Sequence, residues 1–155
     1  WRRIQIASDE YGTFPPEKFE QQFGRDERVL AERQLYLCDG DGEAIGTMTA
    51  WLGERAQWER WGRVHWVAVL PEMQGRGLSK PLMAATMNRL RQLGHERGYL
   101  TTATVRPAAI NLYLKFGFVP LVRHDADARA WRLVAPCLRP EYWGQVVAKL
   151  PELAV

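Results

Sequence analysis

The chain has 155 residues, and 46% of them are hydrophobic, which suits one domain with a single core and argues against intrinsic disorder. Its 21 basic and 18 acidic residues are interspersed, so the net charge of +3 comes without the basic stripe of a nucleic-acid-binding protein. Apolar runs fall short of the roughly 18 residues of a transmembrane helix, and the two cysteines, Cys38 and Cys137, are too few for a disulfide scaffold and lack metal-ligand spacing.

These properties lead us to expect a single domain over residues 1–155 in the cytoplasm, with no metal, nucleic-acid or membrane partner. The chain begins at Trp1, so we expect its natural start to lie upstream.

The first half of the chain predicts two short helices among four strands. Pro15 and Pro16 indicate a helix that stops at Gly24, and Asp26 is a plausible N-cap for the next helix. The expected strands are residues 2–6, 35–38, 44–52 and 64–70, the middle two being joined by a turn at 39–42. The last of these strands is apolar on both faces, which is typical of the centre of a sheet.

The second half predicts helices alternating with strands. One helix runs from Leu78 to Gly94, another from Pro107 to Gly117, and a short one lies within 139–150. The expected strands are residues 99–105, 118–122 and 131–134. This order of elements indicates an α/β fold in which helices cover a mixed central β-sheet.

A glycine-spaced loop, Gln74-Gly75-Arg76-Gly77-Leu78-Ser79, joins the predicted central strand to the helix that follows. Free N–H groups and the positive end of the helix dipole favour a pyrophosphate at such a place. The loop is not a P-loop, because Gly-Lys-Ser/Thr does not follow, and it lacks the third glycine of the dinucleotide fingerprint. Two alternatives remain: a tight turn without a ligand, and a nucleotide-binding protein of another fold, which would bind ATP or NAD.

The loop resembles the acetyl-CoA loop of the GNAT superfamily of N-acetyltransferases, Gln/Arg-x-x-Gly-x-Gly/Ala. Gln74 and Gly77 fall on the motif, and Ser79 is a small-residue departure at its last position. A second segment, residues 107–118, is similar to the family's Asn-x-x-Ala-x-x-x-Tyr-x-x-x-Gly-Phe, with Tyr113 in place and Arg106 where asparagine is usual. Together the two matches imply a GNAT-like fold and acetyl-CoA as the acyl donor.

The resemblance also implies which residues contact acetyl-CoA. Val69 matches the family's strand position that hydrogen-bonds the pantetheine arm, and a backbone N–H of Val67 or Val69 would stabilise the thioester oxygen. Arg106 is expected to meet the cofactor, or else an acidic group on the acceptor. The expected cofactor-binding residues are Val67, Val69, Gln74, Gly75, Arg76, Gly77, Leu78, Ser79 and Arg106.

Two side chains are candidates for catalysis. Freeing the lone pair of an amine with a pKa near 10.4 costs roughly 4.6 kcal/mol at pH 7, so a base is useful. His65 is the candidate base, because it lies four residues before Val69 and is expected to share its face of the strand. Tyr113 is the candidate donor to the departing CoA sulfur. The alternatives are a half-buried strand histidine and a tyrosine that only packs against the strand at 99–105.

The tryptophans suggest where the acceptor binds. Trp51 and Trp66 are expected to pack in the core, whereas Trp58 is the better candidate for the wall of an acceptor pocket.

The predicted reaction is direct acetyl transfer to a small-molecule or peptide amine in a ternary complex, because no cysteine lies where an acyl intermediate would form. The rival prediction is a non-catalytic acyl-CoA-binding module. The resemblance also suggests a homodimer.

Overall fold

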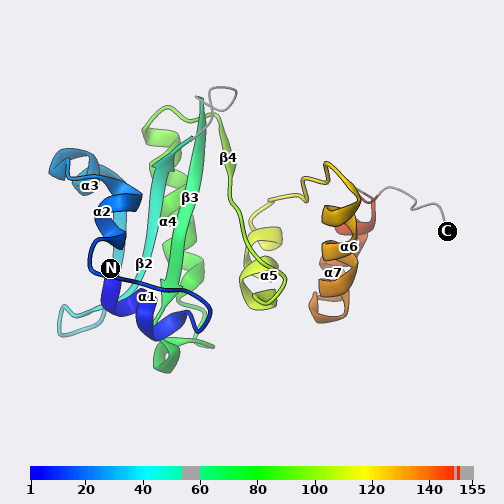
Figure 1. Ribbon diagram of the computed structural model, residues 1–155, viewed down its shortest axis with the longest axis horizontal. Coiled ribbons are helices and arrows are strands. Elements are labelled where there is room, and N and C mark those ends of the chain that lie inside the picture. Colours follow the sequence, from blue (N-terminus) through cyan, green and yellow to red (C-terminus); the bar gives the residue numbers. More distant parts are fainter. Residues whose placement is uncertain (54–59, 149, 151–155) are drawn as a thin grey trace. The chain divides into compact units, whose positions relative to one another are not determined.

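The computed structural model describes residues 1–53, 60–148 and 150. It contains two compact units, Trp1–Leu100 and Thr101–Val155 (Figure 1). The elements of the first unit are α1 (Arg2–Ser8), α2 (Lys18–Phe23), α3 (Glu27–Arg33), β1 (Gln34–Cys38), β2 (Ala44–Leu52), β3 (Trp61–Val69), a 3₁₀ turn η2 (Pro71–Met73), α4 (Ser79–Gln92) and β4 (Arg97–Tyr99).

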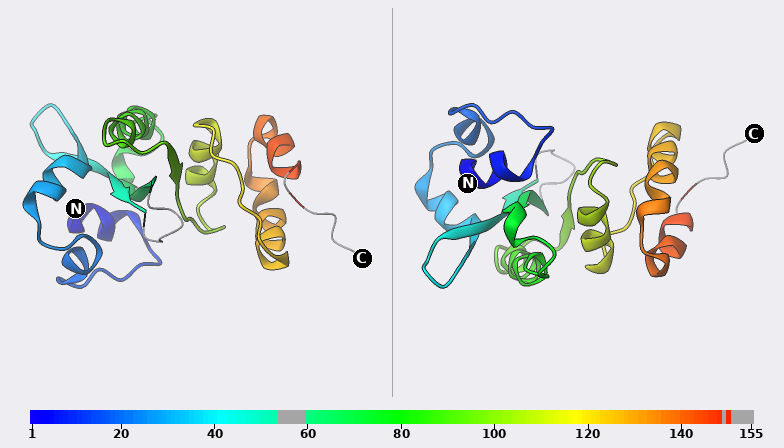
Figure 2. Two further views of the ribbon diagram at one scale, coloured as in Figure 1. Left: turned by 90° about the horizontal axis from the view of Figure 1, so that it is seen from above. Right: turned by 90° about the horizontal axis from the view of Figure 1, so that it is seen from below.

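The four strands form one mixed sheet in the order β1-β2-β3-β4. The β1–β2 and β2–β3 pairs are antiparallel, and β3 pairs with β4 in parallel. Helices α1 and α2 lie on one side of the sheet and α4 on the other, as both views of Figure 2 show. The expected α/β fold, with helices on a mixed sheet in which β3 is an inner strand, is therefore confirmed.

Local signals in the sequence explain several boundaries. The Asp26 carboxylate accepts hydrogen bonds from the N–H groups of Arg28 (3.0 Å) and Val29 (3.2 Å), so it caps α3 as expected. Glycines with a positive φ follow α2 and α4, namely Gly24 (+70°) and Gly94 (+81°). The hairpin strand predicted at 44–52 coincides with β2.

Two strand predictions in the first unit are wrong. Residues 2–6 lie in α1, because the helix buries Ile4 and Gln5 against the sheet and the Gln5 amide donates to the Trp66 carbonyl (3.0 Å). The strand predicted at 99–105 is only the end of β4, since pairing with β3 stops at Tyr99. Tertiary contacts thus override a short alternating pattern in one case, and the lack of a pairing partner ends the strand in the other.

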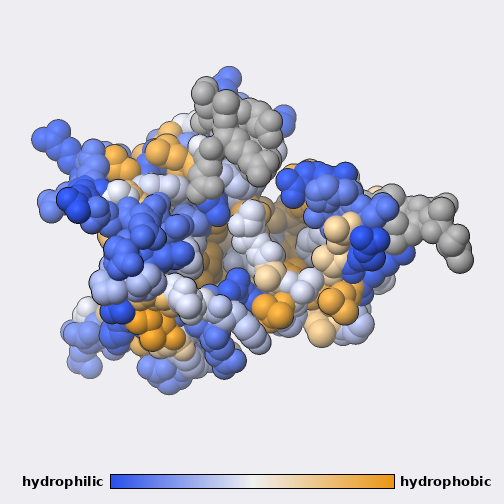
Figure 3. Space-filling model, in the orientation of Figure 1, coloured by the Kyte–Doolittle hydropathy of each residue, from blue (hydrophilic) through white to orange (hydrophobic). Residues whose placement is uncertain are grey.

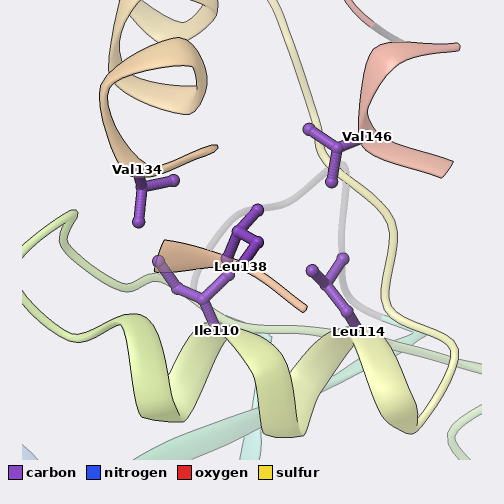
Figure 4. Close-up of a cluster of buried hydrophobic side chains, with 5 residues drawn as sticks. All are labelled: Ile110, Leu114, Val134, Leu138 and Val146. Atoms are coloured by element: carbon purple, nitrogen blue, oxygen red, sulfur yellow. The ribbon is translucent and has the colours of Figure 1, made fainter. Parts of the chain in front are cut away.

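The second unit is helical, with α5 (Pro107–Lys115), α6 (Asp125–Val134), a 3₁₀ turn η3 (Ala135–Cys137) and α7 (Pro140–Val147). Its core is a cluster of buried side chains from these elements, shown in Figure 4: Ile110, Leu114, Val134, Leu138 and Val146.

The strands predicted at 118–122 and 131–134 are both wrong. Ala128, Trp131 and Val134 recur every three residues on α6, and Trp131 and Val134 pack in the core of the unit, so the pattern at 131–134 is helical. Residues 118–122 have no regular secondary structure, and Val119 and Leu121 are exposed.

Figure 3 shows apolar side chains scattered among polar ones on the face it presents. Within residues 1–53, 60–148 and 150, no helix has the length and apolar character needed to cross a membrane. The same residues contain no group of three or more His, Cys, Asp or Glu side chains placed to hold a metal ion.

Candidate functional site

The loop between β3 and α4 has the backbone conformation that the glycine spacing predicts. Gly75 and Gly77 have φ values of +72° and +76°, in the left-handed region that favours glycine. Helix α4 then starts at Ser79, and its N-cap residue, Leu78, supplies no side-chain hydrogen bond to the first turn. The loop therefore presents main-chain N–H groups and the positive end of a 14-residue helix, as an anion site requires.

Gln74 ties this loop to the end of β3. Its side-chain amide donates to the carbonyl of Val69 (2.9 Å), and the same carbonyl accepts a bond from the Ser8 hydroxyl (3.0 Å). The Arg76 guanidinium contacts the sulfur of Met73 (3.2 Å) and is exposed with the rest of the loop tip. Gln74 therefore has a structural contact that its place in the motif did not predict. The contact of Ser8 was also not predicted, because residues 2–6 just before it were expected to form a strand and not the helix α1.

Strand β3 contains a bulge beside the candidate base. Thr47 pairs with Ala68 and Thr49 with His65, so two residues of β3, Trp66 and Val67, stand opposite one residue of β2. Trp66 has a φ of +51° and is the one non-glycine residue with a positive φ in the described part of the chain.

The bulge makes one prediction wrong: His65 does not share a face with Val69. His65 pairs with Thr49 and Val69 pairs with Gly46, and these two β2 residues are three positions apart. Side chains alternate along β2, so the partners of Thr49 and Gly46 lie on opposite faces of the sheet. The inserted residue reverses the alternation that a four-residue spacing assumes.

The backbone of β3 beyond the bulge has an N–H group directed away from β2. The Leu70 N–H donates to the carbonyl of Ile45 (2.9 Å), and successive N–H groups of a strand point to alternate sides. The N–H group of Val69 therefore points toward the edge on which β4 lies, whereas β4 pairs with only Trp61–Arg63. A donor in this position suits the oxyanion or pantetheine contact that the resemblance implies.

His65 is buried on the α2 side of the sheet, with 7% of its surface exposed. Its ring contacts those of Phe23 (5.7 Å between centroids) and Trp66 (5.5 Å), and its Nε2 has no hydrogen-bond partner among the described residues. Burial, and secondarily the charge of Arg63, lower the pKa of His65 to about 3. The imidazole is therefore neutral at pH 7 and is a weak base in the free protein.

Buried and half-buried aromatic rings surround Trp66 on this side of the sheet. The Trp66 ring makes edge-to-face contacts with Trp1 (5.2 Å between centroids) and Phe14 (5.8 Å), and its N–H donates to Gln22 (3.0 Å). Trp51 packs on Phe23. Trp51 and Trp66 thus pack against neighbouring rings, as expected, while Trp58 lies outside the described residues.

Tyr113 and Arg106 belong to the second unit. Tyr113 is buried on α5 and contacts the ring of Phe118 (6.3 Å between centroids), and Arg106 is the exposed N-cap residue of the same helix. Burial raises the pKa of Tyr113 to about 12, against the opposing charge of Arg106. The hydroxyl is therefore protonated at pH 7 and able to donate a hydrogen bond.

Comparison with known proteins supports one family throughout. Residues 3–118 match the model of the acetyltransferase (GNAT) family. A mycothiol acetyltransferase of Streptomyces griseus is 34% identical over 93 residues, which make up 60% of this chain and 28% of that protein. The chain spans less than a third of the length of the curated relatives that it matches.

Solved structures share the fold at low sequence identity. The ribosomal-protein-S18-alanine N-acetyltransferase of Escherichia coli has a TM-score of 0.59 at 20% identity, over 78% of this chain and 70% of that one. A phosphinothricin acetyltransferase of Sinorhizobium meliloti, solved with acetyl-CoA, has a TM-score of 0.58 at 20% identity, over 72% and 60%. Since the family model covers most of the sequence, the chain belongs to the GNAT family of acetyl-CoA-dependent acetyltransferases.

Proposed function

We propose that this protein transfers the acetyl group of acetyl-CoA directly to an amine of a small-molecule or peptide acceptor, within a ternary complex. The observation that carries the proposal is the junction of β3 and α4. There, Gly75 and Gly77, both with a positive φ, open an uncapped helix directly after a strand whose Val69 N–H points away from β2.

The residues of this junction fit the donor. Main-chain N–H groups of residues 75–79 would hold the pyrophosphate, since that of Gln74 donates to the Pro71 carbonyl (3.1 Å), and Arg76 at the exposed tip would add positive charge. A Cβ atom at Gly75 would meet no other atom within 4 Å, so lack of space does not require glycine there. The positive φ requires it, and the surface of the loop is open to a ligand. We place Arg106 among the donor contacts as well, or at an acidic group of the acceptor. When bound, acetyl-CoA supplies an activated acetyl thioester.

The N–H groups of Val67 and Val69 would stabilise the charge that develops on the thioester oxygen. Donors fixed in a strand need no reorganisation during the reaction, which is why such groups are effective. The bulge interrupts the pairing of β3 with β2 at Trp66 and Val67, and the pairing of β3 with β4 stops before it, at Arg63.

His65 is proposed to accept the proton that the nitrogen loses after it has attacked the thioester. Releasing the first proton of an ammonium to solvent costs roughly 4.6 kcal/mol at pH 7. Once the nitrogen's lone pair is committed to the new C–N bond, its remaining protons are far more acidic, so a weak base is then sufficient. This order of events fits a neutral imidazole with a pKa of about 3.

Tyr113 is proposed to donate a hydrogen bond to the departing sulfur. Full proton transfer from a phenol with a pKa of about 12 to a thiolate whose acid has a pKa near 8.5 would be uphill by about 5 kcal/mol. A hydrogen bond stabilises the thiolate without this cost, and solvent completes the protonation.

Two measurements test the proposal. Calorimetry should show coenzyme A binding to the folded protein, and a thiol assay with a panel of amines should show CoA release that depends on the amine. Binding without release for any amine would instead support the non-catalytic acyl-CoA-binding module. No binding would overturn the proposal as a whole.

A further inference from the structure

A lysine of this chain places its ammonium group on the ring of Trp66, in the bulge of β3 next to the candidate base. The Nζ of Lys18 lies 5.9 Å from the centroid of the Trp66 ring, within the range of a cation–π interaction. In the chain, Trp66 stands between His65 and Val67. A primary amine is therefore held on the ring of the residue that separates the proposed base from the proposed oxyanion donor.

Helix α2 fixes the position of this lysine. Gln22 is one turn after Lys18, on the same helical face, and its side-chain oxygen accepts the hydrogen bond of the Trp66 ring (3.0 Å). Phe23, at the end of α2, packs against the ring of His65 (5.7 Å between centroids). Figure 2 shows α2 on the side of the sheet opposite α4. The half-buried Lys18 side chain is thus part of a helix anchored to the bulge of β3.

The ring that receives the ammonium is itself held in place. Trp1 and Phe14 contact Trp66 edge-to-face at 5.2 and 5.8 Å between centroids, and the Gln5 amide donates to the Trp66 carbonyl (3.0 Å). These contacts maintain the φ of +51° at Trp66. A cation on this ring therefore occupies a defined place beside His65, on the face of the sheet opposite the side chain of Val69.

We propose that Lys18 is a self-acetylation site, modified by this protein's own acetyltransferase centre when no other acceptor is bound. The proposal rests on the proposed function. The Lys18 nitrogen first loses a proton to solvent and attacks the carbonyl carbon of the acetyl-CoA thioester. The C–N bond forms, the C–S bond breaks, the nitrogen loses a second proton, and the sulfur leaves as coenzyme A thiol after taking up one proton. The product is a neutral Nζ-acetyl amide that no longer binds Trp66 as a cation.

The other lysines provide an internal control. The chain contains Lys18, Lys80, Lys115 and Lys149, and cleavage at arginine places them on separate peptides. Lys80 and Lys115 are exposed, whereas Lys18 is half-buried. Uncatalysed acetylation by acetyl-CoA would favour the exposed lysines. Preferential acetylation of Lys18 would therefore show that the protein catalyses the reaction.

The test is a time course of the intact protein with acetyl-CoA, followed by peptide mass spectrometry. Lys18 should be acetylated at least about tenfold faster than Lys80 and Lys115, because its amine is held at the site. The modified fraction should not depend on protein concentration, since the reaction is intramolecular. Lys18→Arg should lose the fast modification, whereas the matched Lys115→Arg should keep it. Trp66→Phe should slow it by about twofold to fivefold.

Equal rates at Lys18, Lys80 and Lys115 in the wild-type protein would overturn the proposal, whether or not the Trp66 variant folds. An unchanged rate at Lys18 in a Tyr113→Phe variant whose turnover of external amines has fallen would overturn it too, because the modification would then not use the same catalytic centre. If external amines still release CoA while Lys18 stays unmodified, self-acetylation fails and the proposed function stands. If coenzyme A does not bind at all, both fail.

Discussion

Burial of His65 should make the folding stability of this protein fall as the pH is lowered from 7 to 5. The pKa of His65 is about 3 in the folded chain and about 6.5 when unfolded, so the unfolded state binds more protons between these values. The stability is fully present above the unfolded pKa and is lost progressively as the pH falls below it. Between pH 7 and 5 the loss from this residue is about 2 kcal/mol, and the loss ends near pH 3.

Urea denaturation at pH 7 and at pH 5 measures the effect. In His65→Gln and His65→Phe the fall in unfolding free energy should be smaller than in the wild type by about 2 kcal/mol, whatever their stability at pH 7. His95, whose pKa burial also lowers, contributes equally to all three proteins and cancels. The same fall in wild type and both His65 variants would refute the reasoning.

Three further predictions concern the proposed chemistry. Tyr113→Phe should lower turnover at least about tenfold with little change in acetyl-CoA affinity, and unchanged turnover with chemistry rate-limiting would end the assignment of Tyr113. Gly77→Ala should strain a residue with a φ of +76° by about 1–2 kcal/mol and weaken coenzyme A binding measured by calorimetry, whereas Gly94→Ala, strained at the other end of α4, should leave that affinity unchanged. Arg106→Ala should raise one of the two Michaelis constants, and a variant that keeps both would exclude Arg106 from the donor and acceptor sites alike.

The elements that the sequence predicted well are those marked by local chemistry. Asp26 caps α3 through its own carboxylate, and Gly24 and Gly94 follow helices in the conformation that glycine favours. The loop at 74–79 belongs to the same class, because its glycines are needed for their φ values whatever surrounds them. Such signals act over a few residues, so they are visible without knowledge of the tertiary fold.

The predictions that were wrong depended on partners elsewhere in the chain. Residues 2–6 alternate like a strand but form α1, since Ile4 and Gln5 find their contacts on the sheet. Residues 131–134 are apolar enough for a strand, and the pattern extending back to Ala128 makes them helical. Neither the partner nor the wider face is contained in a window of five residues.

The bulge at Trp66 determines which side of the sheet each candidate residue on β3 faces. No local signal in the sequence predicts it. The positive φ of Trp66 destabilises the folded state by about 1–2 kcal/mol. Its hydrogen bonds with Gln5 and Gln22, of about 1 kcal/mol each, offset that cost. Those two glutamines come from α1 and α2, so the helices on one side of the sheet maintain the backbone of the bulge that precedes the outward N–H group of Val69. It follows that a ligand which displaces α2 would change the direction of the proposed oxyanion donors without contacting them. The proposed oxyanion donors are therefore coupled to α1 and α2 through one strained residue.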